Sequence, residues 1–511
     1  MYHYVFLAAA VVLLAVVTYN AKNRGRRRID GKLPPSPPSL PFLGHLHLMS
    51  PLLHRSLHDL HLRYGTDGGL LLLQLGRRRT LVVSTSSAAA DLYRRHDLAF
   101  ASRPHVAAAH KLSYGSRNIS FAPLGDAWRR NRKAASAHVL SPRRVASFAT
   151  VRAAEAAALV ADVRGRAAAA KWRGLLYGYT NAVVTRAATG AAGTTAEKLK
   201  QLLGNATSLV AGVQADDLLP DVAARVVRWV TGLEKKFDDT IVEWEKFLSP
   251  IMADHMAKKR KEGDEEENFM DVLLRLREEE EKEEEGNTNG FELSDARVKS
   301  LIIDLISAAT ETTSVTLEWA MAELVANPSV MAKLQEEITR SANGKPATAI
   351  TETEVAAMDY LHAVVKETLR LHPAAPILVP HQSTTAAIVQ GYEIPSKTSL
   401  FINAWAIGRD PAAWDSPEEF RPERFLPGGE AAAVDFRGSD YQLVPFGAGR
   451  RICPGINFAV PVLEMALVGL IHGFDWELPA GMAAADVDLS EAPGLTTPLR
   501  VPLRLVPKCK T

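Results

Sequence analysis

The segment from Ser294 to Ala326 constrains the fold more than any other part of this 511-residue chain. Its apolar residues repeat with the 3.6-residue period of an α-helix, and the pattern ends at the Asn327–Pro328 pair. Other stretches rich in alanine and leucine carry the same period, so the sequence predicts a body built mainly from helices. These stretches are Ala88–Arg95, Ala127–Phe148, Glu155–Arg166, Ala196–Val213 and Val222–Met256.

Short runs of β-branched residues predict a minor sheet component. One run is TLVVS at residues 80–84, and two more, AIVQGYEI and TSLFINAW, lie between residues 387 and 405. The charge runs between Lys258 and Gly290 are most simply solvated helix ends and a surface loop. Because no second long linker and no internal repeat occur, we expect residues 45–511 to form one mainly α domain with a small β part.

The N-terminus departs from the composition of the body. Residues 4–19 (YVFLAAAVVLLAVVTY) carry no charge, and a basic cluster and a proline-rich stretch, LPPSPPSLPFLG, follow. A cleavable signal peptide would place its positive charge before the apolar run, and a buried core helix would not be followed at once by such a cluster. We therefore predict a transmembrane anchor at residues 1–21 and a basic, proline-rich hinge at residues 22–44, with the body on the cytoplasmic side. A lumenal body would instead be glycosylated at the sequons of Asn118 and Asn205.

Composition excludes several classes of function. The 60 basic and 58 acidic residues give a net charge of +2, which does not indicate a nucleic-acid partner. The two cysteines cannot form a disulfide framework. The chain also lacks a phosphate-binding glycine loop, a dinucleotide fingerprint and a zinc-binding helix motif.

Cys453 lies in the segment FGAGRRICPG, residues 446–455, between an apolar strand-like stretch and a strongly apolar helical run. A cysteine at a helix start, with Arg450 and Arg451 just before it, is placed where backbone N–H groups and positive charge stabilise a thiolate. Taken alone, the segment is equally consistent with a cysteine that only packs in the core.

The spacing F-x-x-G-x-R-x-C-x-G decides between these interpretations. Phe446, Gly449, Arg451, Cys453 and Gly455 fill it completely, and the segment resembles the haem-binding loop of the cytochrome P-450 superfamily, in particular the plant microsomal monooxygenases. The resemblance implies the cytochrome P-450 fold, haem b as cofactor, and the Cys453 thiolate as the metal ligand that pushes electron density toward bound oxygen.

Three further positions match residues that hold the haem propionates in this family. Trp128 and Arg132 form W-x-x-x-R, and residues four apart share one face of a helix. Such a pair by itself is more often an ordinary amphipathic face. His381 stands where many members have an arginine after a proline, and the resemblance gives it a propionate contact.

The E-x-x-R motif of the family is present as ETLR, residues 367–370. Glu367 and Arg370 lie three residues apart and can pair on one helical face, and PERF at residues 422–425 supplies Arg424 as the third member. The resemblance gives these three residues a structural role beside the haem.

Residues 308–313 (AATETT) lie inside the long helical segment and resemble the oxygen-activating motif of the family. The resemblance makes Thr312 and Glu311 the catalytic residues, with the Thr312 hydroxyl over bound O2 and Glu311 helping to deliver protons. Thr312 can also bond back to the carbonyl of Ala308 and loosen the helix there. Ala309 replaces the usual glycine, which narrows the site without removing a functional group.

The resemblance implies a haem-thiolate monooxygenase that inserts one oxygen atom of O2 into a small apolar substrate, of the plant specialised-metabolite kind. Electrons would come from NADPH through NADPH-cytochrome P-450 reductase, at the endoplasmic reticulum membrane. A haem-thiolate dehydratase or isomerase and a non-enzymatic haem sensor are the alternatives. The reductase would dock on a basic face, and the substrate would contact five segments. The basic face is Arg129, Arg130, Lys133, Arg143, Arg144 and Arg450; the segments are residues 106–122, 209–219, 301–312, 374–379 and 494–497.

Overall fold

A computed structural model of the chain describes residues 32–165, 172–191, 194–210, 221–257, 267–284 and 293–510. The predicted anchor and most of the basic cluster after it lie outside the described residues. Within them the chain is mainly helical with small β-sheets, which confirms that part of the predicted fold class.

Between residues 100 and 380 the described part of the chain forms helices and no strand. The N-terminal ones are α2 (Leu53–Tyr64), α3 (Ser86–Arg95), α4 (Ala107–Leu112), α5 (Asp126–Lys133), α6 (Pro142–Ser147), α7 (Ala149–Arg164), α8 (Trp172–Thr189) and α9 (Thr194–Val210). The later ones are α11 (Asp221–Val230), α12 (Leu233–Ala257), α13 (Phe269–Glu284), α14 (Asp295–Ala326), α15 (Pro328–Ala342), α16 (Glu352–Val355), α17 (Asp359–Leu371), α18 (Ala404–Ile407) and α19 (Ile456–Gly473).

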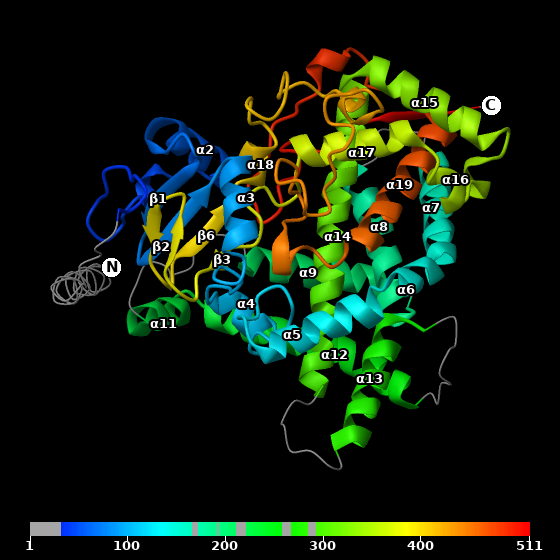
Figure 1. Ribbon diagram of the computed structural model, residues 1–511. Helices are drawn as coiled ribbons and strands as arrows, with labels where there is room; N and C mark the ends of the chain where they lie inside the picture. Colours follow the sequence, from blue (N-terminus) through cyan, green and yellow to red (C-terminus); the bar gives the residue numbers. More distant parts are fainter. Residues whose placement is uncertain are drawn as a thin grey trace, which may run out of the picture.

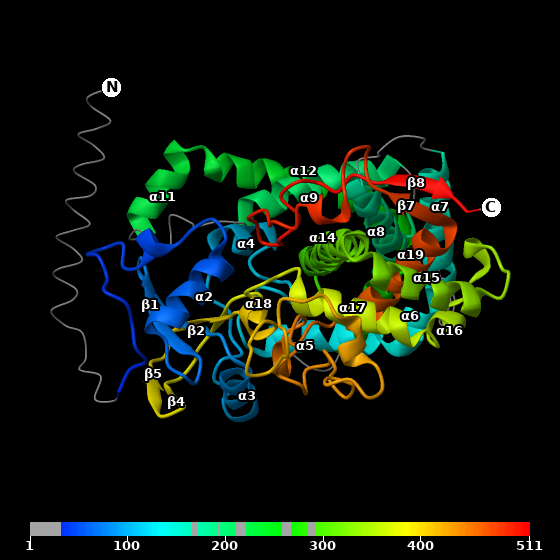
Figure 2. The same ribbon diagram turned by 90° about the horizontal axis from the view of Figure 1, so that it is seen from above.

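The largest sheet of the described residues has the strand order β1-β2-β6-β3 and lies at one side of the molecule, beside α2 and α3 (Figures 1 and 2). Strands β2 and β6 pair in parallel, and the other two pairings are antiparallel. Two antiparallel hairpin-like pairs, β4-β5 and β7-β8, complete the β structure. The strands are β1 (Leu70–Leu75), β2 (Arg78–Val83), β3 (His381–Gln382), β4 (Ala387–Val389), β5 (Tyr392–Ile394), β6 (Ser399–Ile402), β7 (Phe474–Glu477) and β8 (Val506–Cys509).

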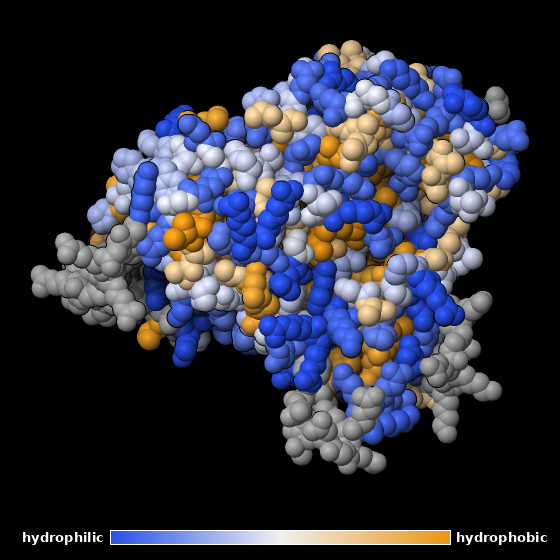
Figure 3. All heavy atoms as spheres, viewed as in Figure 1, coloured by the Kyte–Doolittle hydropathy of each residue, from blue (hydrophilic) through white to orange (hydrophobic). Residues whose placement is uncertain are grey.

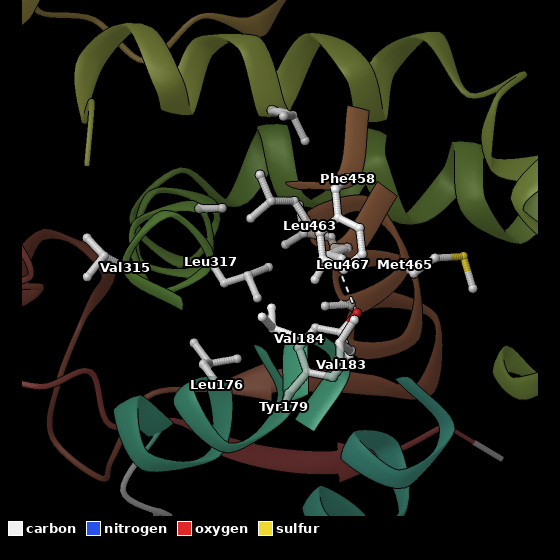
Figure 4. Packing of buried hydrophobic residues seen from close by; sticks show 14 of the residues in the cluster. Leu176, Tyr179, Val183, Val184, Val315, Leu317, Phe458, Leu463, Met465 and Leu467 are labelled. Carbon is white, nitrogen blue, oxygen red and sulfur yellow. Dashed lines mark hydrogen bonds between the residues drawn. The ribbon is translucent and has the colours of Figure 1, made fainter. Parts of the chain in front are cut away.

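Helix α14 is the axis of the helical part. At 32 residues it spans about 48 Å; it crosses the molecule in Figure 1 and is seen end-on in the middle of Figure 2. Helices α8 and α19 pack against it and bury a continuous apolar core (Figure 4). In that core the Tyr179 hydroxyl donates to the carbonyl of Val462, with an O–O distance of 2.9 Å, so α8 and α19 are also tied by a hydrogen bond.

Helix α19 is long and apolar enough to cross a membrane by length and composition, and no other helix of the described residues is. Two-thirds of it (67%) is buried inside the protein, which is the position of a core helix. The surface is mainly hydrophilic: hydrophilic residues cover most of the face in Figure 3, with apolar residues in small groups between them.

Two predicted helices are broken in the structure. The segment predicted as one helix over residues 127–148 divides into α5, a π-helical turn at Ala134–Val139, and α6. Pro142 starts α6, and the Ser141 hydroxyl accepts a hydrogen bond from the N–H of Arg144, so a new helix begins there. The segment predicted over residues 222–256 divides into α11 and α12 at Gly232, whose φ of +69° ends α11.

Helix α8 is absent from the predicted set. Its sequence contains Gly174 and Gly178 and several β-branched residues, which lower helix propensity, and its buried residues surround the helix instead of forming one stripe. Burial between α7, α14 and the C-terminal segment stabilises it as a helix, so tertiary packing overrides the local preference.

Candidate functional site

Cys453 lies in the loop between a 3-10 turn, Gly449–Arg451, and α19. Its backbone N–H donates to the carbonyl of Phe446 at 2.9 Å, which closes the loop. The backbone N–H of Gly455 points at the sulfur, with an N–S distance of 3.4 Å. The sulfur therefore sits in a fixed loop that already supplies one donor to it.

The cation that lowers the pKa of this thiol is Arg132, and not Arg450 or Arg451 as the sequence had suggested. Burial raises the pKa of the Cys453 thiol, whereas the Gly455 N–H and the Arg132 guanidinium lower it. Arg450 pairs instead with Asp97, with a nitrogen–oxygen distance of 3.2 Å. A coordinated metal cation deprotonates a thiol outright, so ligation rather than the adjacent arginines accounts for a thiolate here.

Position 449 requires glycine because the Asp97 carboxylate lies close to its backbone. It has a φ of +64°, and a Cβ atom placed on it would lie 2.2 Å from the Asp97 carboxylate. That carboxylate accepts hydrogen bonds from the backbone N–H of Arg450. Any side chain at position 449 would push Asp97 away and open the loop.

A cavity of about 260 Å³ lies over Cys453. Its lining is mostly apolar and is contributed by α14, the cysteine loop, the start of α19 and the segments around residues 119 and 374–381. The predicted residues Arg132, Thr312, His381, Phe446, Arg451, Cys453 and Gly455 all line it.

The α14 wall of the cavity carries Ala308, Ala309 and Thr312. The Thr312 hydroxyl donates to the carbonyl of Ala308 at 2.6 Å, as its position in the helix predicts. The expected loosening is not seen, because α14 is continuous from end to end.

Glu311 points away from the cavity. Its carboxylate accepts a hydrogen bond from the Thr496 hydroxyl at 2.5 Å, and it does not belong to the cavity lining. The hydrogen bond to Thr496 therefore holds Glu311 outside the cavity, although its neighbour Thr312 lines it.

Three arginines line one edge of the cavity: Arg103, Arg132 and Arg451, which we call the cavity arginines. None of them forms an ion pair with a carboxylate within the described part of the chain; Arg103 and Arg451 donate to backbone carbonyls. Burial lowers the pKa of Arg103 to about 10 and that of Arg451 to about 8, and for Arg451 the other two positive charges add to the effect.

Trp128 lies behind this edge rather than on it. The Arg451 guanidinium stacks over its ring at 4.0 Å from the centroid. The indole Nε1–H is buried and has no hydrogen-bond partner among the residues that the structure describes. A buried N–H without a partner is costly, so a missing acceptor is expected near it.

His381, on β3, is buried and directs Nδ1 to the carbonyl of Phe100 at 3.0 Å. That bond makes Nδ1 the donor, so Nε2 of the neutral ring is an acceptor. Burial, followed by the charge of Arg103, lowers the pKa of His381 well below its ordinary value. His381 can donate a hydrogen bond to a propionate only as the imidazolium. Its surroundings disfavour this charged form, and an adjacent anion would stabilise it.

These features fit haem b. A soft sulfur ligand lies against a mostly apolar cavity, three cations line one edge of that cavity, and an indole N–H without a partner among the described residues lies behind this edge. Buried positive charges without carboxylates need an anion from elsewhere, and the two propionates of haem provide it.

Glu367, Arg370 and Arg424 form a separate buried cluster, with side chains 0% exposed. The Glu367 carboxylate accepts hydrogen bonds from Arg370 at 2.7 and 2.9 Å, from Arg424 at 3.0 Å and from the backbone N–H of Arg421 at 2.8 Å. Arg424 also pairs with the Glu430 carboxylate, and the other guanidinium donors bind carbonyls of residues 408–419. The cluster joins α17 to the loop that precedes the cysteine and leaves no donor for a ligand.

The predicted substrate-contacting segments divide between two cavities. Segments 106–122, 301–312 and 374–379 contribute to the cavity over Cys453. Residues 494–497 contribute instead to a neighbouring cavity of about 550 Å³, which shares Leu378 with the first. Most of segment 209–219 lies outside the described residues. Arg103 and Asp304 also line the first cavity. Arg103 belongs to no motif recognised in the sequence, whereas Asp304 lies within the predicted segment 301–312, where the sequence pattern assigns it no role.

The fold and the site together define a haem-thiolate protein. The sequence profile of the family described as Cytochrome P450 matches residues 34–500. The chain therefore belongs to the cytochrome P450 family, and it is a monooxygenase with haem b as its cofactor.

Plant members are similar over nearly the whole length. Cytochrome P450 736A117 of Prunus mume is 38% identical, covering 98% of this chain and 95% of that protein. Cytochrome P450 71A9 of Glycine max is 37% identical, covering 96% of each chain. Strychnine-11-hydroxylase of Strychnos nux-vomica is 36% identical, covering 95% of this chain and 93% of that protein.

The solved structures agree with the fold. A zebrafish cytochrome P450 solved with progesterone superposes with a TM-score of 0.73, covering 89% of this chain and 99% of that one. The two sequences are 22% identical, so this likeness concerns the fold alone.

Proposed function

We propose that this protein is a membrane-anchored monooxygenase that inserts one oxygen atom of O2 into a small apolar substrate of the plant specialised-metabolite kind. The electrons come from NADPH through NADPH-cytochrome P450 reductase. The observation that carries the proposal is the mostly apolar cavity with Cys453 on one side and Thr312 on the other. Two plant relatives named norfluorocurarine oxidase and strychnine-11-hydroxylase support the substrate class.

The residues around the cavity divide the work of holding the cofactor. Cys453 binds the iron, in a loop whose shape depends on Phe446, Gly449 and Gly455. Trp128, Arg132, His381 and Arg451 hold the propionates. When bound, haem supplies the activation of O2 and the oxygen transfer.

Thr312 relays protons at the cavity surface. Its hydroxyl donates to the Ala308 carbonyl at 2.6 Å, which fixes the oxygen at the cavity surface, where it can accept a proton and pass one on. Glu311 supplies protons from outside the cavity, where it is held by Thr496. The apolar lining excludes bulk water from the substrate.

The membrane placement extends the proposal to the whole chain: residues 1–21 are a single-pass anchor in the endoplasmic reticulum membrane, residues 22–44 a hinge, and residues 45–511 a cytoplasmic catalytic domain. Helix α11 supports a membrane association because it exposes four large apolar side chains. These are Val222 (76% exposed), Val226 (45%), Trp229 (75%) and Val230 (61%).

Glycosylation tests this placement at one sequon only. Asn118 is buried, and its side-chain amide donates to Asp304, so the folded protein hides it. Asn205 is exposed. A glycan on Asn205 in plant microsomes would contradict the cytoplasmic placement.

The reductase docks on the basic face near the cysteine loop. Arg144 is not available for it, because its guanidinium turns inward to the Glu267 carboxylate at 2.5 Å. The remaining members are exposed, and rim charges of this kind mainly increase the association rate. They are Arg129, Arg130, Lys133, Arg143 and Arg450.

The test is reconstitution of the purified chain with the reductase and NADPH, after a screen of apolar aromatic and terpenoid metabolites by substrate-induced spin-state shift. Cys453→Ser should lose the thiolate-type reduced-CO spectrum. Thr312→Ala should keep it and consume NADPH while releasing peroxide. Thr310→Ala is the matched control, since Thr310 makes the same kind of bond, to Ile306 at 2.8 Å, away from the cavity.

Two outcomes would contradict the proposal. Full turnover without NADPH and reductase would indicate a dehydratase or isomerase. An unchanged CO spectrum in Cys453→Ser would show that another residue binds the iron.

A further inference from the structure

Asp304 is a half-buried carboxylate on α14 that the proposed reaction does not use. It lies eight residues before Thr312 and lines the same cavity. Its oxygens accept hydrogen bonds from the side-chain amide of Asn118 at 3.2 Å and from the backbone N–H groups of Ile119 at 2.9 Å and Ser120 at 3.0 Å. Burial raises the pKa of Asp304, and these donors act in the opposite direction.

The residues bound by Asp304 belong to a wall segment, which we define as residues 117–122. Ile119 and Ser120 of this segment line the cavity. The segment has no helix or strand of its own, so its backbone groups need partners elsewhere. Asp304 satisfies two adjacent N–H groups at once.

Arg451 of the cysteine loop and Arg103 bind the carbonyls of the wall segment. Arg451 donates to the carbonyl of Ile119 at 3.0 Å and to that of Ala122 at 2.7 Å. Arg103 donates to the carbonyl of Ser120 at 2.9 Å. The N–H side of the segment is thus bound to α14, and the C=O side is bound next to Cys453.

A third element completes the attachment. Asn131 on α5 donates to the carbonyl of Arg117 at 2.8 Å. Asn131 stands next to Arg132, which lines the cavity. The wall segment is therefore held by α14, the cysteine loop, α5 and Arg103, and each of these four parts of the chain also contributes a residue to the cavity lining.

We propose that Asp304 is the positioning residue of this wall: by binding the N–H groups of Ile119 and Ser120 it sets the distance between the wall segment and α14, and so the width of the substrate chamber. The proposal rests on the proposed function for the identity of the chamber. A direct proton-transfer role is not needed, since both carboxylate oxygens already accept hydrogen bonds.

The test compares Asp304→Ala and Asp304→Asn with the wild-type holoenzyme. The probes are imidazole, which is too small to reach the wall, and 4-phenylimidazole, whose ring extends into the chamber. In Asp304→Ala the Kd for 4-phenylimidazole should rise about tenfold while that for imidazole changes less than about twofold. Amide hydrogen exchange should increase at Ile119 and Ser120.

Asp304→Asn retains one acceptor oxygen for the two N–H groups, so its effect should be smaller, about threefold in the Kd for 4-phenylimidazole. It also decides the test if Asp304→Ala does not retain haem. Glu318→Gln is the matched control, because Glu318 is a buried carboxylate on the same helix that pairs with Arg173 at 3.0 Å outside the cavity. It should leave the ratio of the two Kd values unchanged.

The proposal is wrong if the ratio of the two Kd values stays at the wild-type value in both Asp304 variants, or if Glu318→Gln shifts it equally. It is also wrong if exchange at residues 119 and 120 does not change. Azole binding and hydrogen exchange need neither NADPH nor reductase. A failure of the turnover assay and a failure of this inference are therefore distinguishable.

Discussion

Two buried groups of arginines lie in this protein, and they differ in what surrounds them. Arg370 and Arg424 share the carboxylate of Glu367, and all three side chains are fully buried. The cavity arginines have no carboxylate partner within the described residues, although burial lowers the pKa of each. The charges of the first group are balanced within the protein, whereas the charges of the cavity arginines are balanced only when an anionic ligand binds.

The difference shows how the pairing of charged groups distinguishes a structural cluster from a ligand-binding site. A buried ion pair that is fully hydrogen-bonded costs little while intact and much when one partner is lost. A buried cation without a partner costs stability in the free protein and recovers it on binding. Mutations in the two groups should therefore have opposite signatures.

Glu367→Gln should have the largest effect. It leaves the buried Arg370 guanidinium without a countercharge among the described residues and Arg424 with Glu430 alone, and we expect a loss of about 3–5 kcal/mol in the free energy of unfolding. The measurement is denaturant unfolding together with the yield of folded protein. Glu354→Gln, at a surface capping box, serves as the control. A Glu367 variant as stable as this control would remove the distinction between the two groups.

Arg132→Leu should give the opposite result. Losing one charge-assisted hydrogen bond to a propionate should weaken haem binding about tenfold or more. The apoprotein should be no less stable than wild type, because the variant removes a half-buried cation that has no ion-pair partner among the described residues. Haem transfer to apomyoglobin and thermal unfolding of the apoprotein measure the two quantities. Arg129→Leu, at an exposed position of the same helix, is the control, and a destabilised Arg132→Leu apoprotein would place Arg132 with the scaffold.

The smallest effect is expected at a half-buried ion pair. His362 on α17 binds Glu464 on α19 with an Nδ1–Oε1 distance of 2.7 Å. That hydrogen bond raises the pKa of His362 above 6.5, against the effect of burial. Because the folded pKa is the higher one, the pair stabilises fully below pH 6.5 and its contribution is lost as the pH rises through the folded pKa.

The comparison of wild type with His362→Gln measures this contribution. The difference in Tm should be larger near pH 5.5 than near pH 8.5, by a few degrees or less. A difference that grows toward alkaline pH would have the wrong sign for this pair.

Local patterns predicted more of the site than of the fold's details. The cysteine spacing identified Phe446, Arg451 and Cys453, which do line one cavity. The pattern of a continuous helix failed at residues 127–148, where Ser141 and Pro142 start a new helix. Helix propensity also missed α8, which owes its structure to burial around most of its circumference.

The sequence by itself determined the family, the haem-binding cysteine motif and the long central helix, because each depends on spacing along the chain. Only the tertiary structure decided which side chains share a space. It turned Glu311 toward Thr496, engaged Arg144 with Glu267, and gave Asp304 a role in the cavity wall. The physical reason is that these contacts join residues more than a hundred positions apart, and no local periodicity encodes the partner of a buried charge.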